Sequence, residues 1–188
     1  LKRTLACSSV SQIGFILTGT GLLAGEEKEL AARGTLLHMV NHSLFKLVLF
    51  LSAGAVYMCI HKLDLNDIRG FGRNKRFLKA IFLLGALGIG GVPGFSGYIS
   101  KTLLHEAIVE SHVPAATEWI FLISGGLTVA YMTKLFVAVF VEKNASAKVQ
   151  EAYDRLGSTY MSLRSRIALG GGAVFILLFG LRSEAHTS

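Results

Sequence analysis

Residues 36–50 read LLHMVNHSLFKLVLF, an apolar run that holds His38, His42 and Lys46 at intervals of four residues. In an α-helix each residue advances by about 100° and about 1.5 Å, so these side chains fall on one face in a row roughly 12 Å long. The apolar pattern continues from about Ala32 to His61, which is long enough to cross a bilayer. We therefore predict a transmembrane helix with a row of basic groups on one face.

Ionisable side chains are costly inside lipid, and those found there commonly mark an ion path. Imidazole titrates near neutral pH and can pass a proton through water, whereas a lysine can store the charge. We interpret His38, His42 and Lys46 as a proton relay. Two alternatives stay open: a polar seam that fixes helix contacts, and, more weakly, a zinc site from the two histidines, which no carboxylate or thiol of this segment would complete.

The composition excludes an ordinary soluble domain. Of 188 residues, 52% are hydrophobic and only 16% are charged, and the mean hydropathy is +0.53, values typical of a polytopic membrane protein. The net charge of +7 comes without the basic and aromatic interleaving that binds nucleic acid, so we expect no nucleic-acid partner. Cys7 and Cys59 are too few for a disulfide framework or a metal site. We expect no metal, cofactor or catalytic centre.

Five apolar stretches predict an all-α integral membrane protein with five transmembrane helices, because only helices satisfy the backbone in lipid. The stretches run from about Thr4 to Leu23, Ala32 to His61, Phe77 to His105, Ala116 to Val141 and Leu163 to Leu181.

Most Lys and Arg residues gather before Thr4, between His61 and Lys79, and after Val141, whereas the opposite connections carry only Lys28, Arg33 and Arg182. The positive-inside rule then predicts a cytoplasmic N-terminus and an external C-terminus. We expect a transmembrane domain over 1–141, a polar cytoplasmic linker over 142–162, and a final helix with a short external tail over 163–188. The pattern leaves open whether the linker is a separate amphipathic segment or a helix extension.

The third stretch contains a predicted helix break at Gly90, Gly91, Pro93, Gly94 and Gly97. Proline removes a backbone donor and glycine weakens a helix, and broken helices at mid-membrane are where ion transporters place their sites. Lys101 follows within about one helical turn of the break. We interpret Lys101 as a switchable proton carrier; the alternative is a packing kink with Lys101 snorkelling to the interface.

Other polar groups lie in the predicted spans. Lys134, near Tyr131, is a further relay candidate that either lengthens the path or pairs with an acidic group outside this chain. For four polar residues of the first helix, we favour hydrogen bonds to neighbouring helices over binding of water; they are Ser8, Ser9, Ser11 and Gln12.

Three motifs occur in the order of a known family: LKRTLACSSVSQIG at 1–14, His38-x-x-x-His42-x-x-x-Lys46, and GYISK at 97–101. Together they resemble the antiporter-like, proton-translocating membrane subunits of respiratory complex I (the L-, M- and N-type chains). Related subunits belong to membrane-bound hydrogenases and Mrp-type Na⁺/H⁺ antiporters. The resemblance covers about the first 110 residues, and Cys7 stands where family members often have Tyr.

The resemblance implies an inverted-repeat fold with a broken helix in each repeat. Residues 1–141 would correspond to helices ten to thirteen, and the chain, which begins with Leu and not Met, would be a C-terminal fragment that lacks the first repeat's glutamate and lysine. The histidines and Lys46 would belong to a central hydrophilic axis, and Lys101 to the outer half-channel.

The implied function is proton translocation as a non-redox subunit of a complex I-like NADH:quinone oxidoreductase or a related membrane-bound hydrogenase. The expected partners are other membrane subunits, the lipid bilayer, and protons or Na⁺, in a bacterial or archaeal cell membrane in preference to the mitochondrial inner membrane. Two alternatives are an Mrp-type Na⁺/H⁺ antiporter subunit and a structural membrane subunit without its own channel.

Overall fold

The computed structural model describes residues 1–157 and 160–184, with side chains up to residue 180. Eight helices and no strand occur in these ranges: α1 (Lys2–Leu22), α2 (Lys28–Ile60), α3 (Leu65–Ile68), α4 (Arg76–Gly90), α5 (Ser96–Glu110), α6 (Ala115–Phe140), α7 (Ala147–Arg155) and α8 (Leu163–Glu184). The all-α prediction is therefore confirmed for the described part. Residues 158–159 of the predicted linker and 185–188 of the predicted external tail lie outside it.

Four described helices are long and apolar enough to cross a membrane: α1, α2, α6, and α8 over Leu163–Gly180. The third predicted span is divided into α4 and α5, which have 15 residues each. A single helix of 15 residues is shorter than the ~20 residues that a bilayer requires. The four long helices agree with an integral membrane protein, while the predicted count of five spans depends on α4 and α5 crossing together.

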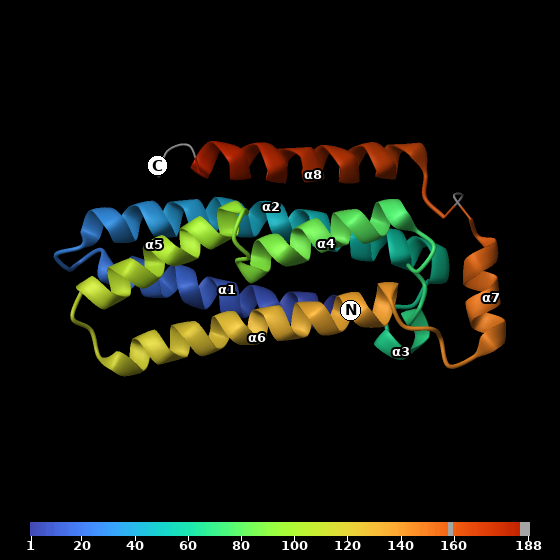
Figure 1. Ribbon diagram of the computed structural model, residues 1–188, viewed down its shortest axis with the longest axis horizontal. Helices are drawn as coiled ribbons and strands as arrows, with labels where there is room; N and C mark the ends of the chain where they lie inside the picture. Colours follow the sequence, from blue (N-terminus) through green and yellow to red (C-terminus); the bar gives the residue numbers. More distant parts are fainter. Residues whose placement is uncertain (158–159, 185–188) are drawn as a thin grey trace.

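α2 is the central helix of the bundle. It packs against α1, α4, α5 and α8, and α8 in turn packs against α2, α4 and α5. Figure 1 shows α8 along one side of the bundle, with α1 and α6 on the opposite side. Phe45, Phe82 and Phe140 belong to the larger apolar core and are among its largest fully buried side chains. Large apolar side chains on the outside, such as Val10, remain exposed, as they are in helices that meet lipid.

The interruption of the third segment lies at residues 91–95, within the stretch where the sequence predicts a break. α4 ends at Gly90, and Gly91 adopts a left-handed backbone with φ of +79°. This conformation costs little only for glycine. Gly97 lies inside α5, where a Cβ would collide with the backbone carbonyl of Gly88. The two half-helices can therefore approach closely because both contact positions lack a side chain.

The linker forms a separate helix, since α6 ends at Phe140 and α7 begins at Ala147. α7 lies across one end of the bundle (Figure 1). Its Tyr153 hydroxyl donates to the Asp67 carbonyl at 2.7 Å, and the Gln150 amide donates to the Gly70 carbonyl at 3.3 Å. The open choice between a helix extension and a distinct segment is resolved in favour of a distinct, docked helix.

Lys75 is buried beneath this docked helix, although it belongs to the basic segment between His61 and Lys79. Its ammonium donates to the Phe71 carbonyl at 2.9 Å and the Tyr153 carbonyl at 3.0 Å, and it lies 4.1 Å from the centre of the Phe71 ring. Burial lowers the pKa of Lys75, because it removes water from the charged form. Lys75 thus joins the α3–α4 connection to α7 as a packed element.

Candidate functional site

Lys46 lies at the α1–α2 contact. Its side chain is buried, and its ammonium donates to the Leu5 carbonyl of α1 at 2.6 Å and to the Ser8 hydroxyl. The row of basic groups therefore begins at α1, with a lysine whose two hydrogen-bond acceptors are uncharged. No carboxylate pairs with Lys46 in the described chain.

His38 lies two turns before Lys46 along α2 and faces α5. Its Nδ1 is 3.1 Å from the Ser100 hydroxyl oxygen, and that hydroxyl donates to the Gly97 carbonyl at 3.1 Å. A hydroxyl has one proton to give, so the Ser100 oxygen accepts from Nδ1–H of His38. Nε2 then carries the lone pair, and it is buried without a hydrogen-bond partner in the described residues. This nitrogen offers an unpaired lone pair inside the bundle.

His42 occupies the position between them. Its side chain is half-buried, and its Nε2 also lacks a partner in the part of the chain that the structure describes. One ring nitrogen on each histidine is therefore buried and free of hydrogen bonds within the described residues.

Lys101 lies across the break, against the C-terminal end of α4. Its ammonium donates to the Ile89 carbonyl at 2.9 Å and the Gly90 carbonyl at 3.1 Å. Helix C-terminal carbonyls carry partial negative charge and favour a cation. The lysine chain passes close to Gly91, where a Cβ would lie 2.9 Å from Lys101 Cδ. The break thus creates a binding site for a cation, and the Lys101 ammonium occupies it.

Phe15 of α1 joins His38 and Lys101. Its ring centroid is 5.7 Å from the His38 ring in an edge contact and 5.4 Å from the Lys101 ammonium. The structure thus brings the row on α2 and the lysine of α5 to one buried aromatic ring. Three helices contribute to this arrangement, which is the candidate site.

Lys134 does not join this site. It is exposed on α6 and makes no hydrogen bond or ion pair within the described residues. It borders a surface hollow between α1 and α6 that also includes Ser11, Ser124 and Tyr131.

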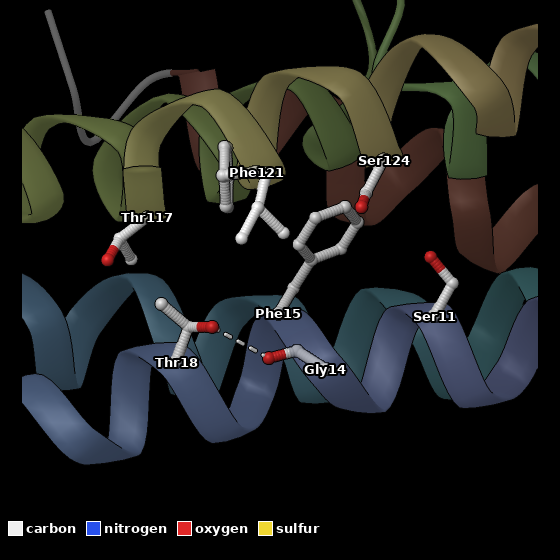
Figure 2. Close-up of a pocket in the computed structure, with 8 residues that line it drawn as sticks. Ser11, Gly14, Phe15, Thr18, Thr117, Phe121 and Ser124 are labelled. Atoms are coloured by element: carbon white, nitrogen blue, oxygen red, sulfur yellow. Dashed lines mark hydrogen bonds between the residues drawn. The ribbon is translucent and has the colours of Figure 1, made fainter. Parts of the chain in front are cut away.

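A pocket of about 320 Å³ opens between α1 and α6 next to the site. Its lining consists of Ser11, Gly14, Phe15, Thr18, Thr117, Ile120, Phe121 and Ser124. Figure 2 shows Phe15 rising from α1 toward α6, and the Phe15 and Phe121 ring centroids are 4.8 Å apart. Both rings line this pocket, and the Phe15 ring also contacts the Lys101 ammonium.

The family model for "NADH:quinone oxidoreductase/Mrp antiporter, TM" matches residues 1–133. The chain belongs to this family. The resemblance carried by the three sequence motifs is thereby confirmed.

Relatives within this family support the assignment. NADH-ubiquinone oxidoreductase chain 5 of Metridium senile is 32% identical over 180 residues, which cover 94% of this chain and 28% of the relative. F(420)H(2) dehydrogenase subunit L of Methanosarcina mazei is 31% identical over 184 residues, covering 93% of this chain and 27% of the relative. The chain therefore spans less than a third of the curated relatives it matches.

A solved structure has a similar fold. Respiratory complex I from Thermus thermophilus with bound aureothin contains a chain that matches with a TM-score of 0.50 and 17% identity, covering 96% of this family member and 44% of that chain. At this identity the likeness supports the fold alone.

Sequence reasoning missed two members of the site, Phe15 and Ser100. Phe15 reads as one more apolar residue of α1, and Ser100 as a small polar residue beside Lys101. Ser100 could have been suspected because it precedes the lysine of the GYISK motif; no local signal singles out Phe15. The expected interhelical role is confirmed for Ser8, which bonds Lys46, and for Gln12, whose amide donates to the Thr128 hydroxyl at 3.3 Å.

Proposed function

We propose that this chain forms part of a proton-translocating, non-redox membrane subunit. The parent assembly would be a complex I-like NADH:quinone oxidoreductase or a related membrane-bound hydrogenase. The observation that carries the proposal is the junction at Phe15, where the basic row of α2 meets the lysine seated on the broken helix. Membership of the family supports it independently.

Each basic residue has a distinct role in the proposed path. Lys46 stores a proton, His42 and His38 pass it along α2 through intervening water, and Lys101 receives it at the end of α4. The unpartnered Nε2 atoms of both histidines suit this role, because each offers a lone pair inside the bundle. Lys134 either lengthens the path or pairs with an acidic group outside this chain, and its exposure favours the pairing.

The proposed setting follows the sequence expectations. α4 and α5 together form the third of five spans, residues 1–141 form most of one repeat of an inverted-repeat fold, and 142–162 lie in the cytoplasm. Protons enter from the cytoplasmic side, and the C-terminus lies outside. The membrane is a bacterial or archaeal cell membrane.

The energy would come from partner membrane subunits that move charges toward or away from the lysines. A pump requires such coupling between a driving site and a two-state element. The break between α4 and α5 is suited to be that element, since the two hydrogen bonds by which Lys101 holds it are stronger when its nitrogen is charged.

An Mrp-type Na⁺/H⁺ antiporter subunit is the second candidate, since the family description includes both. Sodium sites in transporters use unwound backbone carbonyls and half-helix C-terminal ends. Here the two carbonyls at the end of α4 already accept from the Lys101 ammonium, and no described carboxylate bonds Lys46 or Lys101. This arrangement favours protons over Na⁺.

We therefore expect proton transport by the complex in sealed vesicles to proceed at an unchanged rate when all Na⁺ is replaced by choline. The measurement is a pH-sensitive dye inside the vesicles, with uptake of radioactive Na⁺ followed in parallel. Transport that stops without Na⁺, together with Na⁺ movement opposite to H⁺, would establish the antiporter instead.

A further inference from the structure

Four rings in successive contact connect the basic row of α2 with one end of the bundle. His38 contacts Phe15 as described, Phe15 contacts Phe121 at 4.8 Å, and Phe121 stacks on His105 at 6.0 Å. The rings come from α2, α1, α6 and α5 in that order. The line thus connects a buried histidine with His105, whose side chain is 35% exposed.

His105 pairs with Glu118 where α5 ends and α6 begins. The His105 Nε2 and Glu118 Oε1 atoms are 3.1 Å apart, and the Glu118 side chain is 38% exposed. An ionised carboxylate only accepts hydrogen bonds, so Nε2 of His105 carries the proton and Nδ1 is the basic nitrogen when the ring is neutral. No hydrogen bond reaches Nδ1 in the described residues. Water can therefore reach a histidine that has an open nitrogen and a carboxylate to stabilise its charge.

Lys101 and His105 lie one turn apart on α5, and residues four apart face the same side of a helix. Phe15, which contacts Lys101, and Phe121, which stacks on His105, are almost completely buried at 3% and 7% exposure. Packed aromatic rings exclude water, so they oppose a continuous water chain that would let protons leak back. Glu106 and Glu110 on α5 are exposed, and the α1–α2 connection and the start of α2, at the same end of the bundle (Figure 1), add Glu26, Glu27, Lys28, Glu29 and Arg33.

We propose that the His105–Glu118 pair is the proton-release site of this subunit and that Phe15 and Phe121 form the barrier behind it. The inference rests on the proposed function and adds to it the place where protons leave the subunit. An N–H bond of the Lys101 ammonium breaks and its proton passes through water to Nδ1 of His105, leaving a neutral amine and an imidazolium. The Glu118 carboxylate stabilises the imidazolium. The imidazolium then gives one proton to bulk water and returns to its neutral form.

The competing explanation is a clamp that only fastens α5 to α6. Partly exposed ion pairs contribute little to stability, and a clamp needs a hydrogen bond but no titration. His105→Gln separates the two roles, because a glutamine amide can still donate to Glu118 but cannot carry a proton at neutral pH.

The experiment uses the complete complex in sealed vesicles, with proton transport and assembly measured together. We expect His105→Gln to assemble normally and to lower proton transport roughly tenfold, since a positioned proton carrier is lost while water replaces it in part. We expect His105→Ala to lose transport similarly, and imidazole added on the releasing side to restore it. Glu118→Gln should lower transport less, because the imidazolium loses only its stabilising charge.

Arg33→Gln is the matched control, since it breaks the exposed Arg33–Glu29 pair, 2.7 Å apart, without touching the row. It should transport like the wild type. Wild-type transport by His105→Gln, with no imidazole effect on His105→Ala, would show that the pair is only a clamp. If Lys101→Met blocks transport while the His105 variants do not, the release site alone is wrong; if Lys101→Met also transports normally, the proposed function falls with it.

Discussion

Lys101→Met is expected to abolish proton transfer through this subunit while leaving the complex assembled. Methionine has a similar length and fills the space beside Gly91 and Phe15, but it cannot bind a proton. Loss of a positioned proton carrier typically costs about a hundredfold or more in rate. The two carbonyls that Lys101 contacts lie at a helix end beside glycines, where water can replace the ammonium as donor. The measurement is proton uptake by vesicles that contain the purified complex, driven by its own electron-transfer reaction.

The control for this prediction is Lys148→Met. Lys148 is an exposed lysine of α7 without a hydrogen bond or ion pair in the described residues, so its replacement removes the same charge outside the site. Transport should then match the wild type. Full transport by Lys101→Met in an assembled complex would support the third candidate, a structural membrane subunit whose polar residues only join helices.

Gly97→Ala is expected to prevent normal assembly. A Cβ at position 97 would overlap the Gly88 carbonyl and lie 3.1 Å from a Phe45 ring carbon. A backbone carbonyl cannot rotate away as a side chain can, so α4 and α5 would have to separate. Overpacking of this kind costs about 1–3 kcal/mol, and more where backbone must move. We expect little assembled complex in the membrane and a lower thermal transition for what remains.

Gly54→Ala is the control for Gly97→Ala, because it adds the same methyl group at a position where no neighbouring atom is close. Gly54 lies within α2, and a Cβ there meets no atom within 4 Å. Alanine is favoured over glycine in a helix by about 0.5–1 kcal/mol, so this variant should be at least as stable as the wild type. Equal assembly of the two alanine variants would contradict the close α4–α5 contact.

The two substitutions thus probe different properties of the break. Lys101→Met removes the charge at the end of α4 and leaves the helix contact intact, whereas Gly97→Ala disrupts the contact and leaves the charge. The break therefore combines a charged group with a close helix contact, and each of the two can be removed separately.

The sequence alone determined the long apolar helices, the membrane setting, the region of the break and the row on α2, whereas it did not indicate α3 and left α7 open. These features depend on short-range regularities: apolar runs of sufficient length, glycine and proline in mid-segment, and basic residues four apart on one helix face. The family likewise followed from contiguous motifs. The sequence does not indicate that Lys75 is buried, because nothing local reveals that a helix more than seventy residues later would cover it.

Only the tertiary structure decided which of these groups meet. Phe15, His38 and Lys101 come from three helices, and their contact depends on how closely α5 can approach α2 across Gly88 and Gly97. The same packing seats the Lys101 ammonium on the last carbonyls of α4 and leaves Lys134 on the outside. Contacts between distant segments are fixed by the shapes that pack together, and no spacing along the chain encodes those shapes.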